Sequence, residues 1–391
     1  MSTNYLPAQR ISEDAKLTLR GTAFAARGDI SDKVIRGYVE VPLSSGRKRK
    51  VISDVGYQFT IPVLCTFASL LPLFTSWQKI RYGQAVAPRP IPITEVNTDN
   101  NFTAVAHGLS TSDTVQIYRD CAFPACTPAL SVSEVYTVTA TDADTFTLTT
   151  TTGSPTLVDI TSATLNGGLW VVKQDTLIVN QRDSTQRTFL NVVPVELPDL
   201  VFNGSALQWE GNLVIRCFPK LGATAAGGTA NFFTSTNAAF TAATWAGTED
   251  ITISDMTAAW ASGRTSTLET SFRCEKGMRV SFKPELSMID DGIFSSASAF
   301  LKDFKVSAKG IPLGLLTSEF LAEFAPNQGA QLTGANLVLT ATGVALTLYD
   351  AQLSEGSQSF GTDKPLVDEL TWEAMGNSTS DNKPPFLLAA S

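Results

Sequence analysis

The sequence predicts a mainly β protein with two tandem β-units, one short helix in each unit, and a small all-β insertion. Two observations carry this prediction. The 391-residue chain is rich in Thr, Ser and Ala, and its 27 Gly and 19 Pro are scattered along it, as expected when turns separate many short strands. In addition, one pattern of apolar and polar residues occurs twice, in segments 177–218 and 336–375.

The two copies of this pattern have the same order of features. Each begins with an apolar strand, at Leu177 and Leu337, and continues through a second strand to a Phe, which is Phe202 or Phe360. Each ends with a strand of period-two alternation, which predicts one buried face and one wet face. The residues on the buried face are Leu213, Ile215 and Cys217 in the first copy, and Leu370, Trp372 and Ala374 in the second. We interpret the copies as an internal duplication. A chance resemblance between two antiparallel hairpins is the alternative.

Shifts in composition divide the chain into parts. Three prolines between Pro88 and Pro92 form a stiff linker before a Thr-rich stretch, and a Gly-rich segment forms a second joint. The predicted parts are an N-terminal arm (1–36), a discontinuous first unit (37–93 and 174–221), an inserted β-module (94–173), a linker (222–228) and a second unit (229–391). The weakly patterned arm either orders against a partner or holds a first short strand followed by a linker.

The first unit contains one strand and one helix that are legible from pattern. Alternation over residues 37–43 predicts a strand. Thr66 is suited to cap a helix whose apolar residues continue to Phe74, and Pro72 predicts that this helix is short. We expect its apolar stripe to pack on the core.

The second unit repeats this strand-then-helix order. A strand at 300–308 precedes a helical stripe at 317–324, which we again expect to face the core. Asp290 and Asp291 precede a Gly in a turn, with too few further ligands for a calcium loop. Other predicted strands of this unit lie at 250–253, 267–272 and 278–286.

The charge balance and the few His and Cys residues argue against several classes of function. The chain has 29 Lys and Arg against 37 Asp and Glu, a net charge of −8, which is untypical of a protein that reads duplex DNA. Its single histidine leaves little for acid–base catalysis near neutral pH. Five cysteines without a paired spacing predict free thiols, including the neighbours Cys121 and Cys126. We therefore predict no enzyme activity, no cofactor and no metal.

No segment suggests a membrane or secretion signal. The longest apolar run, 61–74, is interrupted by Pro62 and Pro72 and is too short to span a bilayer. The N-terminus lacks the basic and then apolar pattern of a signal peptide. These patterns predict cytoplasmic synthesis and no membrane partner.

Four consecutive cations, Arg47, Lys48, Arg49 and Lys50, follow a Ser-Ser-Gly turn and are the candidate site residues. A solvated hairpin tip is one interpretation. The other is a contact with an acidic surface, either on another subunit or on nucleic acid. Because the rest of the chain is acidic, we favour a contact with protein.

The Thr-rich insertion resembles a small β-barrel module called FCCH-like, which recurs as an insertion in phage structural proteins. The matching residues are His107-Gly108-Leu109, Asp113 with Val115 and Ile117, Tyr136-Thr137-Val138, and Asp144-Thr145-Phe146-Thr147-Leu148. His107 stands in a turn with no nucleophile or metal set around it, so we interpret it as a residue that hydrogen-bonds the turn.

The two β-units together resemble the tail tube proteins of long-tailed bacteriophages. The resemblance covers residues 37–93 and 174–375, and the insertion and residues 1–36 depart from the family pattern. The residues that carry it are Phe360-Gly361-Thr362-Asp363 with Asp368-Glu369-Leu370-Thr371-Trp372, a weaker echo from Phe202 to Ile215, and Lys309-Gly310-Ile311-Pro312 before Thr317.

This resemblance implies a virion structural protein of the phage tail. Each unit would be a tail-tube-type β-sandwich or barrel with one flanking helix. Six such units would close a ring through strand pairing, and the rings would stack into a hollow tube for DNA ejection. The implied partners are other copies of the chain, the tape measure protein, other tail proteins, and genomic DNA that passes without sequence-specific binding. A neutral or negative lumen would let phosphates slide.

Other classes stay open at this point. A tail terminator, a baseplate hub or a decoration protein shares the phage context. A β-rich adhesin or binding module would require a signal peptide or disulfides, and a hydrolase would require a nucleophile with a base. The duplication favours a ring wall, and it predicts three chains per pseudo-sixfold ring. We expect the insertion to decorate the outside of the tube and Arg47–Lys50 to contact the neighbouring ring.

Overall fold

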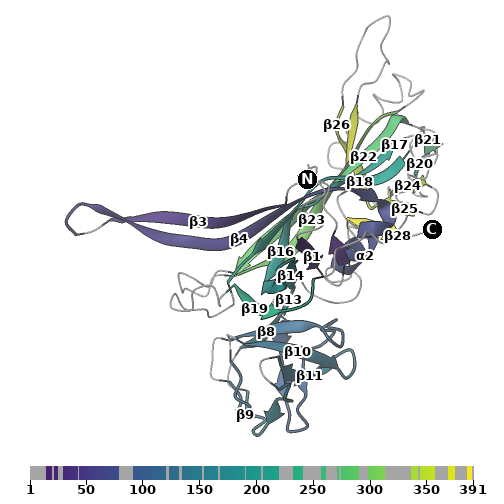
Figure 1. The fold of residues 1–391 in the computed structure, drawn as a ribbon. Coiled ribbons are helices and arrows are strands. Elements are labelled where there is room, and N and C mark those ends of the chain that lie inside the picture. The colour runs from purple at the N-terminus through teal and green to yellow at the C-terminus, as the bar shows by residue number, and fades with distance from the viewer. Residues whose placement is uncertain are drawn as a thin grey trace, which may run out of the picture.

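Figure 1 shows the fold in a computed structural model, in which the described part of the chain is mainly β and holds five sheets and one α-helix. The structure describes residues 15–19, 22–24, 30–42, 44–78, 91–119, 123–131, 134–151, 154–165, 168–189, 191–203, 206–219, 232–240, 257–260, 271–272, 274–289, 298–312, 336–341, 344–356, 369–374 and 385–389.

The first β-unit is built from two sheets that pack on each other. Sheet A has the order β19-β15-β14-β1-β2, and its strands are β1 (Ala15–Leu19), β2 (Thr22–Phe24), β14 (Leu177–Gln181), β15 (Thr185–Phe189) and β19 (Phe233–Asn237). The first part of the nine-stranded sheet B holds β3 (Ser31–Pro42), β4 (Lys48–Thr66), β16 (Val192–Glu196), β17 (Asp199–Asn203) and β18 (Ala206–Cys217). Phe59 of sheet B meets Phe189 of sheet A edge-on, with ring centroids 4.9 Å apart.

The second β-unit has the same construction. Sheet E has the order β21-β20-β24-β25-β28, and its strands are β20 (Thr257–Trp260), β21 (Ser271–Phe272), β24 (Leu337–Ala341), β25 (Val344–Leu348) and β28 (Phe386–Ala389). The rest of sheet B holds β22 (Cys274–Ile289), β23 (Ser298–Pro312), β26 (Ala351–Glu355) and β27 (Leu370–Ala374). Sheet B therefore runs without a break through both units.

The described strand pairings of the two units correspond, except that β17 has no described counterpart in the second unit. In sheet A, β14 lies between β1 and β15, and β19 follows β15, just as β24 lies between β20 and β25 and β28 follows β25 in sheet E. In sheet B, the β3–β4 hairpin pairs with β18 through β4, and the β22–β23 hairpin pairs with β27 through β23. The backbone thus supports the interpretation of an internal duplication.

The registers of the two hairpins also match, including their irregularities. The pair Val34–Tyr57 corresponds to the pair Phe282–Val306. Three pairs further toward each tip, after Gly37 and Glu285 respectively, the second strand of the hairpin holds one extra residue. A second pair of matching bulges lies elsewhere in sheet B. One is in the β16–β18 pair after Pro194, and the other is in the β26–β27 pair after Leu353. Because a bulge is a positional feature, its repetition at aligned sites is strong support for duplication.

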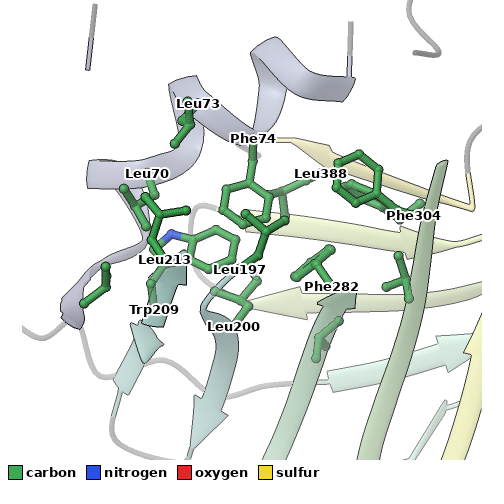
Figure 2. Packing of buried hydrophobic residues seen from close by; sticks show 14 of the residues in the cluster. Leu70, Leu73, Phe74, Leu197, Leu200, Trp209, Leu213, Phe282, Phe304 and Leu388 are labelled. Atoms are coloured by element: carbon green, nitrogen blue, oxygen red, sulfur yellow. The ribbon is translucent and has the colours of Figure 1, made fainter. Parts of the chain in front are cut away.

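The helix α2 (Phe67–Gln78) follows β4 and covers the core at the point where the two units meet. Below it lies the fully buried Trp209, whose indole N–H donates a 3.0 Å hydrogen bond to the carbonyl oxygen of Phe67. Phe74 stacks on Trp209 at a centroid distance of 4.1 Å and meets Phe282 of the second unit edge-on at 5.2 Å. Figure 2 shows these rings together under the helix. One apolar core therefore serves both units.

The helix begins where the sequence predicts but does not end early at Pro72. Thr66 immediately precedes it, and the Thr66 and Ser69 hydroxyl oxygens are 3.0 Å apart. Pro72 has no N–H to donate to the carbonyl of Ala68, one turn earlier. Both residues are exposed, so water can satisfy the Ala68 carbonyl oxygen. The helix therefore continues past Phe74 to Gln78.

The insertion forms its own sheets and its own core. Sheet C has the order β5-β13-β8-β10-β11-β7-β6, and β9 pairs with β12. Its residues form an apolar cluster separate from that of the two units. Ile91 pairs with Val171, so the two ends of the module lie side by side. The strands are β5 (Ile91–Ile93), β6 (Glu95–Val96), β7 (Phe102–Thr103), β8 (Thr114–Arg119), β9 (Cys126–Thr127), β10 (Val135–Ala140), β11 (Thr145–Thr150), β12 (Asp159–Ile160) and β13 (Leu169–Gln174).

The segment expected as an N-terminal arm contributes strands to the first unit instead. Leu17 and Leu19 of β1 are each 1% exposed in the common core, so this segment contains the first short strand that one of the two alternatives specified. β3 begins at Ser31, six residues before the predicted strand 37–43. Several predictions fall outside the described residues, namely the linker 222–228, the strand 250–253, the turn at Asp290–Asp291, the helix 317–324, Cys121 and the second-copy Phe360.

Candidate functional site

The four candidate cations lie at the tip of the β3–β4 hairpin. Gly46 turns the chain there with a φ of +75°, a left-handed conformation that suits glycine, and Arg47, Lys48 and Arg49 are exposed. The only ion pair that the described residues of the tip make joins Lys48 Nζ to Glu40 Oε2 at 3.2 Å, between two exposed side chains. The backbone of Lys50 pairs with Glu40 across the hairpin. The tip therefore presents mainly positive charge to solvent.

This tip stands away from the rest of the molecule. β18 pairs with β4 only from Tyr57 to Thr66. Among the described strands, the outer part of the hairpin pairs only with itself, and it projects as a two-stranded ribbon (Figure 1). The structure thus brings the four predicted site residues together at the end of a long hairpin, where Arg47, Lys48 and Arg49 are accessible to another molecule.

A second feature is the junction between the two units inside sheet B. β17 of the first unit pairs with β22 of the second, with Leu200 opposite Val280 and Phe202 opposite Met278. All four side chains are buried. Together with Phe74 on Phe282, this pairing joins the units through both backbone hydrogen bonds and apolar packing.

Ion pairs connect the same strands on the other face of the sheet. The guanidinium of Arg279 lies 3.0 Å from Asp199 Oδ2 and 3.5 Å from Glu210 Oε2, so one cation links β17, β18 and β22. On the next strand, Lys305 Nζ lies 2.9 Å from Glu285 Oε1. The hydrogen bond and charge of Glu285 raise the pKa of Lys305 above its ordinary value. These pairs are exposed and so contribute little to stability.

Sheet B therefore has two different faces. Alternate residues of its central strands are buried in the core, such as Val280, Phe282, Phe304 and Val306. The residues between them form a polar face. On this face Arg279 and Lys305 are paired with carboxylates, whereas Lys283 and Lys309 make no ion pair in the described part of the chain; the face also includes Thr60, Asn212, Ser281 and Ser307.

Three of the described cysteines, Cys126, Cys217 and Cys274, are poorly suited to nucleophilic or metal-binding chemistry. Burial raises the pKa of Cys274 to about 12 and also raises that of Cys217. Burial and then the charge of Asp159 raise the pKa of Cys126 to about 11. These thiols therefore stay protonated near neutral pH, and a thiolate is the form that attacks or binds metals. In the described part of the chain, no group of three or more His, Cys, Asp or Glu residues is arranged to hold a metal ion.

His107 supports a turn of the insertion, as its sequence context predicts. Its Nδ1 accepts a 2.9 Å hydrogen bond from the Leu109 N–H, and its Nε2 lies 3.3 Å from the Thr145 carbonyl oxygen. The ring also packs edge-on against Phe146. The imidazole is 1% exposed, and these contacts assign it a structural role.

No protein-family model and no curated protein sequence matches this chain. Among the described residues, no helix combines the length and the apolar character that a membrane crossing requires.

Sequence reasoning located the basic tip. It missed the β17–β22 junction, and it missed the N-terminal part of β3, which is the last described strand of sheet B. The β3 residues Ser31–Val34 are exposed and three of the four are polar, so their apolar alternation is too weak to predict a strand. An alignment of the two hairpins, residues 31–60 with 279–309, is the signal that could have revealed the full length of β3. Their shared bulges are visible only in the strand pairings.

Proposed function

We propose that this protein is a virion structural protein that assembles into rings, and that the rings stack to form the hollow tail tube of a long-tailed phage. The observation that carries the proposal is the duplicated β-unit whose copies share one continuous sheet. A repeated unit that already extends a sheet from one copy to the next is the construction that a ring wall needs, because pairing around a ring removes open strand edges.

Two further features suit the same function. The polar face of sheet B, with Arg279 and Lys305 held by carboxylates, would be a suitable wall for a lumen through which DNA slides. The β3–β4 hairpin, with Arg47, Lys48 and Arg49 exposed at its tip, has the reach to contact a neighbouring ring. In this role the chain has no catalytic residue and needs no cofactor, and its partners are other copies, the tape measure protein, other tail proteins and passing DNA.

Electron microscopy of the purified full-length chain tests the proposal. We expect hollow tubes built of stacked rings, with three chains in each ring. Single rings that never stack would favour a tail terminator or a baseplate hub instead. A chain that stays monomeric over a wide range of protein and salt concentrations would contradict a tube function.

Retention of DNA gives a second measurement. Assembled tubes should not retain double-stranded DNA at physiological ionic strength if this face lines the lumen, because carboxylates hold Arg279 and Lys305. Tight, strongly salt-dependent retention would show that the wall facing the DNA is basic and would argue against this face as the lumen wall.

A further inference from the structure

The strands β26 and β27, at one end of sheet B, bring three exposed carboxylates together. Glu355 is the last residue of β26, Glu369 directly precedes β27, and Glu373 lies within β27. All three side chains are exposed, and none of them makes an ion pair with a described residue. Glu355 pairs with Thr371, which lies between the other two on its strand, so the three side chains share one face of the sheet. We call these three residues the acidic end.

The aligned strands of the first unit have the same backbone but not this charge. The matching bulges align β16 with β26 and β18 with β27. The residues aligned with the acidic end are Glu196, Asn212 and Arg216, in the same order. One carboxylate, one amide and one cation thus take the place of three carboxylates. Because neighbouring like charges repel each other, the acidic end is suited to meet cations that come from another molecule.

The opposite charge lies at the other end of the same sheet. In the strand order of sheet B, β26 and β3 are the two end strands, and the β3–β4 hairpin has Arg47, Lys48 and Arg49 exposed at its tip. Pairing with β18 stops at Tyr57, and from there to Gly46 the hairpin extends roughly 35 Å as an isolated ribbon. In Figure 1 the ribbon projects away from β26. The tip is therefore placed to reach the acidic end of another copy and not that of its own chain.

We propose that the acidic end of one copy is the docking surface for the basic tip of a second copy. The two surfaces differ, so the contact is heterologous, and copies add through it in one direction. Contacts of tip with tip, or of acidic end with acidic end, are disfavoured because like charges meet. The inference rests on the proposed function and deepens it, because it names the surface that receives the tip in the neighbouring ring.

Charge reversal in the full-length chain tests the contact. The tip variant carries Arg47→Glu, Lys48→Glu and Arg49→Glu. The end variant carries Glu355→Lys, Glu369→Lys and Glu373→Lys. Sedimentation at low ionic strength measures the protein concentration at which half of the chains are in the largest assembly that the wild type forms. Thermal unfolding followed by circular dichroism shows that each variant is folded.

Each variant alone should need a concentration at least about tenfold higher than the wild type, because its tip and its acidic end then have the same sign. An equal mixture of the two variants should restore the wild-type concentration, because each tip then finds an end of opposite charge on the other variant. Reversed charges that only disturb folding or solubility do not recover on mixing. Failure of the mixture to recover, or loss of assembly in the tip variant alone, overturns the inference.

A control variant places the same change of charge on the insertion. Glu95→Lys, Asp99→Lys and Asp159→Lys reverse three exposed carboxylates there, and we expect no change in assembly. A loss as large as that of the end variant overturns the inference, since net charge would then explain both.

The outcomes for the docking surface and for the tube function are separable. If the wild type forms assemblies other than tubes, and mixing the two reversed variants restores them, the docking surface stands and the tube function fails. If the wild type forms tubes, and both reversed variants form tubes equally well, the tube function stands and the docking surface fails.

Discussion

The two β-units share a backbone but differ at the strand that begins each hairpin. β22 lies between two strands of sheet B, and its core side chains include Val280 and Phe282. At the aligned positions of β3, the chain has Asp32 and Val34, both exposed. A charged residue on an open strand edge discourages indiscriminate pairing. The comparison shows one backbone arrangement in two settings, as an internal joint at β22 and, among the described strands, as an edge strand at β3.

The two β-units also differ in their ion pairs and in the charge of the residues that connect each hairpin. Arg279 ties β22 to β17 and β18 through Asp199 and Glu210, whereas the aligned residue of β3 is Ser31. The first hairpin has a basic tip, and the residues that join β22 to β23 include two Asp and no Lys or Arg. The duplicated units are therefore equivalent in backbone but not in charge, so a ring of three chains would have true threefold symmetry.

The largest effect should come from the aligned pair Phe282 and Val34. We expect Phe282→Ala to lower the free energy of unfolding of the monomer by about 3–5 kcal/mol, because it leaves a cavity under α2. Val34→Ala should change it by no more than about 0.5 kcal/mol, because the side chain is largely exposed. Urea unfolding at low protein concentration measures both. Similar losses in the two variants would show that the β3 edge is covered within the monomer.

A smaller effect, confined to stacking, is expected from the basic tip. Replacing Arg47, Lys48, Arg49 and Lys50 by Ser should leave ring formation intact and shorten the tubes. Each exposed pair contributes only about 0.2–1 kcal/mol, but the contact repeats around the ring. Tube lengths at low and high salt, measured by electron microscopy, test this prediction. Since wild-type elongation should itself weaken with salt, tubes of equal length in all four conditions would leave the tip with no role in stacking.

The acidic tip sequence of the second hairpin offers a matched variant for that experiment. Asp290→Asn together with Asp291→Asn removes negative charge from the corresponding place in the other unit. If Arg47–Lys50 of one ring attract Asp290 and Asp291 of the adjacent ring, this variant should shorten tubes in the same salt range. Shortening by the basic-tip variant alone would point to a different acidic surface on the neighbouring ring.

A modest effect is expected when Arg279 of β22 is replaced by Ser, the residue at the aligned position of β3. Arg279→Ser removes the exposed pairs with Asp199 and Glu210 and should lower the free energy of unfolding by about 0.5–1 kcal/mol at low salt. Because salt screens exposed pairs, the loss should shrink at high ionic strength. Urea titrations at two salt concentrations measure this difference. A loss that does not change with salt would mean that Arg279 acts through packing of its side-chain methylenes.

The smallest effect is expected from removing the insertion. Its core is separate, and Ile91 and Val171 pair at its base, so a short Gly/Ser linker is able to join the flanking chain. We expect the unfolding temperature of the remainder and tube assembly to stay nearly unchanged. Normal folding with loss of assembly would instead show that the insertion takes part in contacts between subunits.

Much of the fold could be predicted because its strongest signals are local. The strands that begin at Leu177 and Leu337, and the alternation ending at Cys217 and Ala374, appear in the structure as β14, β24, β18 and β27. A first short strand in residues 1–36 was one of two alternatives, but β1 and β2 could not be located from the sequence, because strands of five and three residues are too short to show a period. The length of α2 could not be predicted, because it depends on whether Pro72 faces solvent. Pro72 does so in the structure, and water can then bond the Ala68 carbonyl oxygen that Pro72 leaves without a donor.

The candidate site was likewise predictable only in its local features. A run of four cations is visible in any reading of the sequence, and the structure places the described ones at an exposed tip. The β17–β22 junction depends on pairing between residues about eighty positions apart, and no local pattern reports such a partner. The exposure of Val34 likewise follows only from what lies beside it in space.

Covalent linkage of the two units through the β17–β22 joint changes how an assembly grows. A contact within one chain forms at an effective concentration in the millimolar range even with a flexible linker, far above the concentration of a free subunit. In a ring of six units from three chains, half of the joints would thus be complete as soon as each chain folds. Only three encounters would then remain, which lowers the translational entropy lost on closing the ring. The duplication would also keep the two kinds of unit in strict alternation, whatever the amount of protein that is made.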